Sequence, residues 1–469
     1  MKIEQIYTNC LSQGAYYIES NGEVAIIDPL REVQPYINKA ALNKAKIKYI
    51  FETHFHADFV SGHVTLAKIS GAPIIYGPEA KPSFKAIIAE DNQEFKLGEL
   101  TIKVLHTPGH TIESCTFLLQ DKNGNDHAIF SGDTLFLGDV GRPDLAQKTD
   151  NLTEEDLAGL LFESLREKIM PLDDNVIVYP AHGAGSACGK NMMKQTVDSL
   201  GNQKKMNYAL RADMSKDEFI KEVTEGLLSP PQYFPLNVKM NKEGYEDFKL
   251  VLKRGSKQFS ANDFEKVAKE KEAIIIDVRP QDDYAKGHIP NSIFIGLNGS
   301  FAPWVGTLIA DTSQPILIVA PIGAEEETIT RLSRVGFDNI VGFLKNGFNA
   351  WVKESRGFDT VLQVTANTLE DFFNIAEAPI FDVRKESEYH SEHMLHAKNT
   401  PLSRVHQHLN RYPANKPFYI YCAGGYRSMI AISILKSKGV HNVIDVKNGF
   451  KSIKNTNIPI SNFVCPTTF

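Results

Sequence analysis

The stretch Thr53-His54-Phe55-His56-Ala57-Asp58-Phe59 stands directly after the apolar run Ile47–Phe51. Three later segments carry the same kinds of side chain, again beside β-like runs: His106-Thr-Pro-Gly-His110, Ser131-Gly-Asp133 and Tyr179-Pro-Ala-His182-Gly183. Imidazole and carboxylate groups are ligands of divalent zinc and iron. A single histidine is usually a structural residue, but four such clusters in this order predict a metal centre.

The pattern around these segments predicts an α/β layered sandwich. Six short apolar runs separated by turn residues are expected to be strands: Val24–Ile27, Ile47–Phe51, Pro73–Tyr76, Leu100–Leu105, Thr116–Leu119 and His127–Phe130. Helical patterns follow at Thr153–Ile169 and Lys190–Leu200. The segment from Ser229 to about Gly244 carries prolines and no strong periodicity, so we place a boundary near residues 245–258 and expect a first domain over residues 1–250.

The last two fifths of the chain contain a repeat. Ala273-Ile-Ile-Ile-Asp277-Val-Arg279 recurs as Ala378-Pro-Ile-Phe-Asp382-Val-Arg384, and Asn346-Gly-Phe348 recurs as Asn448-Gly-Phe450. A period of about 100 residues indicates duplicated domains, because solenoid repeats are much shorter. Apolar runs alternate with helical patterns in each copy. We therefore expect two small α/β domains with parallel sheets, at residues 256–360 and 362–469.

Composition excludes several classes of protein. The chain has 469 residues, of which 42 % are hydrophobic and 23 % charged, as in ordinary globular proteins. A net charge of −6 without a basic block argues against a nucleic-acid partner. No window approaches the roughly 18 apolar residues of a membrane span, and Glu4 and Gln5 stand where a signal peptide would be apolar. Five scattered cysteines do not form a disulfide framework, so we expect a cytoplasmic protein.

The four metal-type segments resemble the metallo-β-lactamase superfamily, whose metal motif runs His-x-His-x-Asp-His, then His, then Asp, then His. The resemblance implies an αββα sandwich. Phe59 departs from this motif, because the two-metal hydrolases of the superfamily carry a histidine at this place for the second metal. Phenylalanine cannot coordinate a metal, so a second site built on Asp58 and His182 is incomplete. A two-metal thioesterase of the glyoxalase II type is thereby disfavoured.

One metal held by two histidines and one carboxylate is the ligand pattern of non-haem Fe(II) oxygenases. The sequence resembles the persulfide dioxygenase branch of the superfamily, which implies one Fe(II) per chain. By that resemblance the iron ligands are His54, His110 and Asp133. Three further residues are then orienting neighbours of the ligands: His56, Asp58 and His182. The spacing leaves open whether His56 is itself a ligand.

The loop Gly138-Asp-Val-Gly-Arg142-Pro-Asp144 also resembles that branch. There the matching arginine faces the carboxylate of a thiol such as glutathione, a contact that suits the planar guanidinium group. An equally good alternative is a loop arginine paired with Asp139 or Asp144.

The second repeat copy contains Tyr421-Cys422-Ala423-Gly424-Gly425-Tyr426-Arg427-Ser428 between an apolar run and a helical pattern. This resembles the active loop of rhodaneses. Backbone N–H groups and a helix N-terminus at such a loop form an anion site, which would stabilise a thiolate or persulfide on Cys422. Gly424 and Gly425 allow the tight turn, and Arg427 can hold a sulfur oxyanion. We expect Cys422 and Arg427 to be catalytic.

The first repeat copy has no cysteine at the matching place. Its segment Val319-Ala-Pro-Ile-Gly-Ala-Glu325-Glu-Glu327 carries three glutamates at the end that should attract anions. It resembles an inactive rhodanese-like domain kept for packing or positioning. Elsewhere, Cys188 stands six residues after His182, and we expect a packed small residue there in preference to a redox or substrate-contacting thiol.

The order of domains resembles bacterial persulfide dioxygenase–rhodanese fusion proteins over nearly the whole chain. It implies oxidation by O2 of a persulfide of glutathione, coenzyme A or another small thiol, giving sulfite and free thiol. It also implies sulfur transfer at Cys422 to form thiosulfate, or the reverse exchange, in sulfide detoxification. A homo-oligomer is expected.

Two other classes of function stay open from the sequence. One is a metal-dependent thioester or lactone hydrolase with a fused sulfurtransferase, which two metals per chain would favour. The other is a non-catalytic sulfur-sensing scaffold, which a lack of oxygen uptake would favour.

Overall fold

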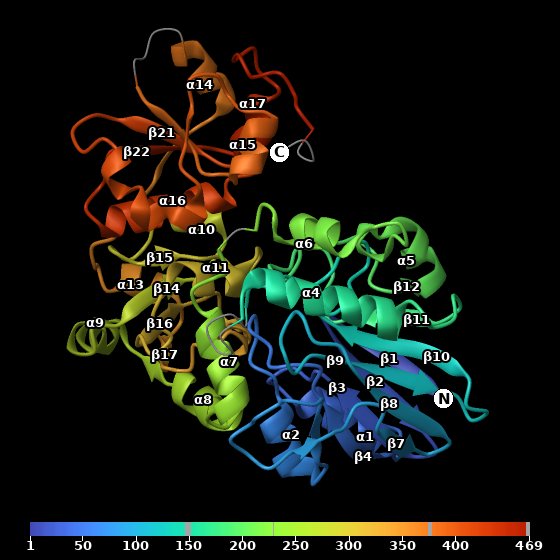
Figure 1. Ribbon diagram of the computed structural model, residues 1–469. Coiled ribbons are helices and arrows are strands. Elements are labelled where there is room, and N and C mark those ends of the chain that lie inside the picture. Colours follow the sequence, from blue (N-terminus) through green and yellow to red (C-terminus); the bar gives the residue numbers. More distant parts are fainter. Residues whose placement is uncertain (146–151, 228, 374–377, 466–469) are drawn as a thin grey trace. The chain divides into compact units, whose positions relative to one another are not determined.

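The computed structural model describes residues 1–145, 152–227, 229–373 and 378–465, and it divides into two compact units (Figure 1). The first unit comprises Met1–Leu250 and Leu332–Gly336, and the second comprises Val251–Arg331 and Phe337–Phe469. Among the described helices, none combines the length and the hydropathy that a bilayer crossing requires.

Two six-stranded sheets form the core of the first unit. The first sheet has the order β1 (Lys2–Thr8), β2 (Gln13–Ser20), β3 (Glu23–Ile27), β4 (Lys46–Phe51), β5 (Ile74–Tyr76) and β6 (Ile87–Ile88). The second has the order β12 (Asp198–Ser199), β11 (Ile177–Pro180), β10 (Asp126–Gly132), β9 (Cys115–Gln120), β8 (Leu100–His106) and β7 (Glu94–Leu97). The six expected strands are all present.

Alternation along the strands places these sheets face to face. On β2, Tyr16 and Ile18 enter the core between the sheets, whereas Ala15 and Tyr17 enter a second core under the helices. Helices α1 (Gln34–Leu42) and α2 (His63–Ser70) cover the outer face of the first sheet. The outer face of the second sheet is covered by α4 (Glu154–Ser164), α5 (Leu200–Met206) and α6 (Lys216–Thr224). The expected αββα sandwich is confirmed.

One of the two helix expectations differs from the structure. The pattern at Thr153–Ile169 forms α4 followed by a π-helical turn, Leu165–Ile169, as expected for a helix. The helix expected at Lys190–Leu200 is wrong, because α5 begins only at Leu200. Asp139 explains the difference: one of its carboxylate oxygens accepts the backbone N–H groups of Lys190 and Asn191, which holds this segment as a loop.

The proline-bearing segment before the boundary is also helical. Helix α7 (Phe234–Glu243) has its proline in the first turn, where the missing N–H would be unpaired in any case. It is followed by α8 (Phe248–Gly255). Weak hydrophobic periodicity therefore does not exclude a helix in this segment, because only a narrow face of α7 is buried.

Two five-stranded parallel sheets form the second unit. The first has the order β13 (Gln258–Phe259), β17 (Ile340–Leu344), β16 (Ile316–Val319), β14 (Ile274–Asp277) and β15 (Ile293–Phe294). The second has the order β18 (Leu362–Val364), β22 (Val443–Val446), β21 (Phe418–Tyr421), β19 (Ile380–Asp382) and β20 (Lys398–Asn399). The same strand order in both copies confirms two α/β domains with parallel sheets.

The helices of the two copies also correspond in order. The first copy contains α9 (Ala261–Glu270), α10 (Gln281–Lys286), α11 (Phe301–Leu308), α12 (Glu325–Arg334) and α13 (Phe348–Lys353). The second contains α14 (Ala366–Phe373), α15 (Glu386–Ser391), α16 (Tyr426–Ser437) and α17 (Gly449–Ile453), with a 3-10 helix, η3 (Leu402–Gln407), at the place of α11.

The repeated Asp-Val-Arg segment has the same structural role in each copy. At the end of β14, Arg279 Nη2 donates to Asp277 at 2.6 Å and to the carbonyl of Gly287 at 2.7 Å. At the end of β19, Arg384 Nη2 donates to Asp382 at 2.6 Å and to the carbonyl of Glu392 at 2.8 Å. The motif therefore ties the strand end to the segment after the next helix.

Candidate metal centre and cysteine loop

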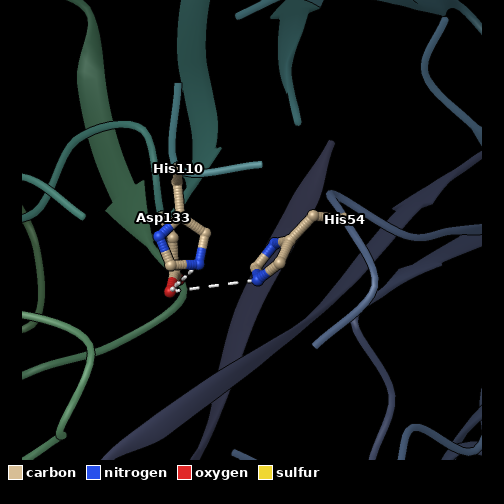
Figure 2. A group of neighbouring side chains, drawn as sticks. All are labelled: His54, His110 and Asp133. Atoms are coloured by element: carbon tan, nitrogen blue, oxygen red, sulfur yellow. Dashed lines mark ion pairs between the residues drawn. The ribbon is translucent and has the colours of Figure 1, made fainter. Parts of the chain in front are cut away.

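The metal-type side chains come from the ends of strands in both sheets of the sandwich. His54 follows β4 of the first sheet, and His110, Asp133 and His182 follow β8, β10 and β11 of the second. The ligand atoms of His54, His110 and Asp133 all lie within 4.8 Å of one another (Figure 2). The fold thus gathers three groups that are up to 79 positions apart in the sequence.

Asp133 links this triad. Its Oδ2 atom is 3.3 Å from Nε2 of His110 and 3.9 Å from Nε2 of His54. Both carboxylate oxygens of Asp133 and Nε2 of His110 are buried, and none has a hydrogen-bond partner among the described residues. Burying a carboxylate without a partner is costly unless a cation pairs with it. The orphaned oxygens and nitrogen therefore fit a bound metal ion.

The tautomers of both histidines suit coordination through Nε2. His110 Nδ1 lies 2.8 Å from the carbonyl oxygen of Arg142, which can only accept, so Nδ1 carries the proton. Thr53 Oγ1 donates to Asp28 at 2.9 Å, so it accepts from Nδ1 of His54 at 3.0 Å. Burial, followed by the neighbouring imidazoles, lowers the pKa of His54 well below its usual value. Both Nε2 atoms are thus left with a lone pair.

A second cluster lies against the first. His56, Asp58 and His182 have ligand atoms within 4.8 Å of one another. His182 Nε2 is 3.4 Å from Asp58 Oδ2 and 3.6 Å from Asp133 Oδ1, so it faces both clusters. Phe59 is fully buried, and its ring centroid lies 4.4 Å from that of His56. A packed phenyl group therefore stands beside His56, where an imidazole could complete a second metal site.

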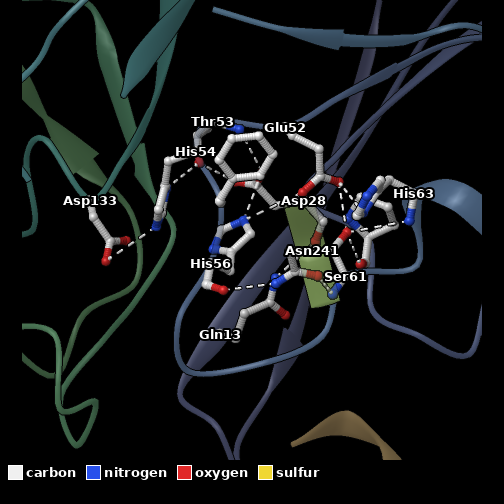
Figure 3. A network of polar contacts seen from close by, with 12 residues as sticks. Gln13, Asp28, Glu52, Thr53, His54, His56, Ser61, His63, Asp133 and Asn241 are labelled. Carbon is white, nitrogen blue, oxygen red and sulfur yellow. Dashed lines mark hydrogen bonds and ion pairs between the residues drawn. The ribbon is translucent and has the colours of Figure 1, made fainter. Parts of the chain in front are cut away.

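His56 is held by carboxylates on its far side (Figure 3). Its Nε2 atom lies 3.1 Å from Asp28 Oδ1 and 3.8 Å from Glu52 Oε2. Burial alone would lower the pKa of His56, but the Asp28 and Glu52 carboxylates raise it to about 9. Glu52 also accepts from Ser61 Oγ at 2.7 Å. The imidazole of His56 is thus oriented by a buried polar network rather than by solvent.

Four members of this network were not expected from the sequence: Asp28, Glu52, Thr53 and Asn241. Asn241 of α7 donates to the carbonyls of His56 and Phe59 at 2.7 and 2.8 Å and accepts the N–H of Ser61 at 2.9 Å. It therefore clamps the metal-type loop from a distant helix. Asp28 follows β3 directly and has a φ of 49°, unusual for a residue other than glycine, but its position after a strand was the only signal in the sequence.

Cys188 lies at the metal-type cluster. Its Sγ atom and the ligand atoms of Asp133 and His182 all lie within 4.8 Å of one another. Burial raises the pKa of this thiol well above its usual value, and the nearby Asp58 and Asp133 carboxylates add to the shift. The side chain is buried, as expected of a packed residue, but it faces the candidate metal ligands.

Arg142 forms a two-pronged ion pair with Asp144. Nε and Nη2 each donate to a carboxylate oxygen of Asp144 at 2.6 Å, and Nη1 donates to the carbonyl of Ala187 at 3.2 Å. The sequence leaves two alternatives for Arg142, a contact with a substrate carboxylate or an ion pair within the loop. In the structure, the arginine is paired with Asp144. Its carbonyl oxygen orients His110, so the same residue lies close to the triad.

The cysteine loop connects β21 to α16. Cys422 is buried, and the backbone N–H of Gly425 donates to its Sγ atom at 3.1 Å. Gly425 caps α16 with a φ of 98°, a left-handed conformation that favours glycine. The sulfur thus lies at the start of a twelve-residue helix, where unpaired N–H groups favour an anion.

Arg427, in the first turn of α16, is already paired. Its Nη1 and Nη2 atoms donate to the two carboxylate oxygens of Glu388 at 2.5 and 2.8 Å. Burial raises the pKa of Glu388, but its hydrogen bonds and charge pairing with Arg427 lower it below its usual value overall. The guanidinium group is therefore fixed beside Cys422, with part of its charge balanced. The matching loop of the first copy has no sulfur atom.

Two family models match the chain. The model of the metallo-beta-lactamase superfamily matches residues 9–182. The model of the rhodanese-like domain matches twice, over residues 260–354 and 365–456. These ranges correspond to the sandwich and to the two repeat copies.

Several named proteins are similar in sequence to the αββα domain. A probable hydroxyacylglutathione hydrolase of Schizosaccharomyces pombe is 31 % identical over 167 residues, which are 35 % of this chain and 60 % of that protein. The mitochondrial persulfide dioxygenase ETHE1 of Homo sapiens is 28 % identical over 228 residues, 47 % of this chain and 78 % of that protein. The match to the S. pombe protein thus spans less than two thirds of its length.

A solved structure covers more of the chain. The crystal structure of a metallo-beta-lactamase from Staphylococcus aureus is 30 % identical, with a TM-score of 0.65, and the match covers 73 % of this chain and 98 % of that one. The protein therefore belongs to the metallo-β-lactamase superfamily and carries two rhodanese-like domains after its metallo-β-lactamase domain.

Proposed function

We propose that this protein oxidises low-molecular-weight persulfides with O2 at one Fe(II) per chain, and transfers sulfur at Cys422. The first reaction converts RSSH, O2 and H2O into RSH and sulfurous acid, which ionises to sulfite. The second moves the outer sulfur of another persulfide to sulfite and yields thiosulfate. Consumption of persulfides in this way would detoxify sulfide. Five scattered cysteines without a disulfide framework suit a reducing compartment, and we propose the cytoplasm.

The observation that carries the proposal is Phe59. A buried phenyl ring packs on His56 where a two-metal hydrolase would place a further ligand, while the triad beside it has orphaned ligand atoms. Two histidines and one carboxylate leave open positions for substrates on iron. The relative named persulfide dioxygenase supports the same reading.

The residues of this chain have distinct proposed roles. His54, His110 and Asp133 would hold Fe(II), which when bound activates O2 toward the persulfide. Asp58 and His182 lie beside the triad and would hold a proton or a water molecule at the His182 Nε2 atom, which has no hydrogen-bond partner among the described residues. Arg142 would bind the anionic carrier thiol by exchanging its pairing with Asp144.

A metal-dependent hydrolase of the glyoxalase II type is the second candidate. The relative named hydroxyacylglutathione hydrolase favours it, as does the second buried cluster of His56, Asp58 and His182. Metal-bound hydroxide would be its nucleophile. This candidate requires two metals per chain, so it makes a different prediction for metal content.

Oxygen uptake tests the proposal. Iron-loaded protein given glutathione persulfide should consume one O2 for each sulfite or thiosulfate released, and His54→Ala or Asp133→Ala should lose iron and oxygen uptake together. His127→Ala is a matched control, because His127 lies on β10 outside both clusters. Hydrolysis of S-lactoylglutathione without oxygen uptake would instead establish the hydrolase.

A further inference from the structure

A cavity of about 570 Å³ opens beside Cys422, within the second unit. Nine of its fifteen lining residues belong to the cysteine-free first copy. Four of these nine form what we call the first-copy wall: Gln281, Asn298, Ser300 and Trp304. The domain that cannot carry sulfur is therefore part of the pocket in which sulfur is carried.

Close packing fixes this wall against the start of α16. The hydroxyl of Tyr426 donates to the carbonyl of Gly296 at 2.7 Å, and a Cβ on Gly299 would lie only 2.4 Å from the Tyr426 ring. The N–H of Phe294 donates to Ser433 Oγ of α16 at 3.0 Å, and the Phe294 ring packs edge-on against Tyr426. The two copies thus share one packed surface beside the cysteine loop, which makes the pocket a built feature of both.

The size of the cavity suits an organic molecule. Pockets for small organic ligands have volumes of about 300–1,000 Å³, and this cavity falls within that range. Thiosulfate and sulfite have only a few heavy atoms and would leave most of the space empty.

The chemistry of the lining suits an anionic thiol carrier. No carboxylate lines the cavity among the described residues, whereas Arg279, Lys385 and Arg427 do. Both arginines are paired with carboxylates outside the lining, and Lys385 has no ion pair with any described residue. Lys385 can therefore pair with a ligand carboxylate. Amide and hydroxyl groups of the first-copy wall offer hydrogen bonds, and Trp304 offers an apolar face.

We propose that the first-copy wall binds the carrier portion of an organic persulfide, and that Lys385 pairs with the carrier's carboxylate. Such a persulfide, rather than thiosulfate, is then the sulfur donor to Cys422. This inference rests on the sulfur transfer proposed above and specifies where the carrier portion of its donor binds. It also gives the first copy a role, because that copy selects the donor while the second copy performs the chemistry.

Sulfur transfer from the persulfide to Cys422, and from Cys422 to sulfite, needs no further reagent. The Cys422 thiolate attacks the outer sulfur of RSSH, the S–S bond breaks, and the carrier leaves as RSH with the proton. Cys422 then holds the outer sulfur as a persulfide anion. After RSH has left, sulfite takes that sulfur, which restores the thiolate and releases thiosulfate. The large pocket serves the first step, and the small acceptor needs only the loop beside the sulfur.

Anaerobic sulfur-transfer kinetics on the full chain test the inference, because the oxidation cannot run without O2. Two donors, glutathione persulfide and thiosulfate, are compared with cyanide as the acceptor. Trp304→Ala and Lys385→Ala should each raise the KM for glutathione persulfide about tenfold, while constants for thiosulfate change less than about twofold. Trp304→Phe should restore most of the loss. Trp351→Phe, which changes the other tryptophan of the chain, should alter neither donor.

Binding provides a second readout. In the Trp351→Phe background, Trp304 is the only tryptophan left, so titration with S-methylglutathione should change its fluorescence to saturation. The combination of equal effects on both donors and an unchanged fluorescence would overturn the inference while leaving sulfur transfer intact. A wild-type protein that transfers sulfur from neither donor would contradict the proposed sulfurtransferase itself.

Discussion

The phenyl ring of Phe59 packs on the imidazole of His56, with ring centroids 4.4 Å apart and planes inclined by 36°. This contact lies beside the cluster of His56, Asp58 and His182, whose ligand atoms are close enough to share a metal. The ring contributes no ligand and excludes water from one side of His56. The relationship separates the proposed one-metal oxygenase from a two-metal hydrolase, and it can be changed by a single substitution.

Replacing Phe59 with histidine should shift the metal content from one toward two per chain. A new imidazole would stand beside His56, Asp58 and His182, which supplies the missing ligand. Burial of a polar ring in a packed site should cost about 1–3 kcal/mol of stability in the metal-free protein. Metal analysis after loading with excess zinc measures the effect, and Phe59→Leu is the control that should stay at one. A content of one metal in the Phe59→His variant would refute the assigned role of Phe59.

Replacing Arg142 with alanine should weaken binding of charged persulfides. The guanidinium group makes a two-pronged pair with Asp144, and in the proposed role it exchanges this carboxylate for one of the substrate. Loss of such a charge-assisted contact should raise the KM for glutathione persulfide about tenfold and lower kcat less. Asp144→Asn is the matched control, because it removes the carboxylate that competes with the substrate for the arginine and should lower the KM. Identical kinetics of wild type and Arg142→Ala with charged and uncharged persulfides would show that the arginine is only structural.

The metal chemistry and the thiolate chemistry use different residues, so Cys422→Ser should spare oxygen uptake. Serine retains the size of the side chain and can still accept the N–H of Gly425, but it is a far poorer sulfur nucleophile. Wild type should produce thiosulfate together with sulfite, and the variant sulfite alone. Ion chromatography of the products provides the measurement. Loss of oxygen uptake at unchanged iron content would mean that the two sites are coupled.

Much of the fold follows from short-range patterns in the sequence. The continuous apolar runs before His54 and Asp133 predict strands, because a strand of the sandwich buries both of its faces. The sequence around Lys190 predicts a helix, because the Asp139 carboxylate that holds its backbone N–H in a loop is distant in the sequence.

The supporting network of the site could not be predicted for a similar reason. Asp28 and Asn241 contact the segment of His56 from elements 28 residues before and 185 residues after it, and no local pattern marks them. The partner of Arg142 was one of two equal alternatives, because spacing alone cannot distinguish a loop ion pair from a substrate contact.

Asp445 should make the stability of the second unit depend on pH. Burial raises the pKa of this carboxyl group to about 6, although Gln363 donates a hydrogen bond to it at 2.9 Å. The unfolded chain has a pKa of about 3.9, so the folded state binds the proton more tightly. The contribution of Asp445 to stability should be highest below about pH 4, fall as the pH rises to about 6, and then stay level, a loss of up to about 3 kcal/mol.

Asp445→Asn should remove this dependence, because an amide cannot ionise. The variant should be more stable than wild type at pH 7 by about 1–3 kcal/mol and equal to it near pH 4. Thermal unfolding between pH 4 and 7.5 measures the difference. A gap between variant and wild type that does not change with pH would disprove the ionisation of Asp445 as its cause.

The proposed oxidation at one iron per chain is tested most simply by the metal content of the active wild-type protein. It is measured on the sample whose oxygen uptake is recorded. Anaerobic reconstitution with excess Fe(II), followed by removal of unbound metal and elemental analysis, gives the stoichiometry. We expect one iron per chain, bound through the triad of His54, His110 and Asp133, with oxygen uptake proportional to that iron. Two metals per chain in a protein that hydrolyses a thioester and takes up no oxygen would contradict it.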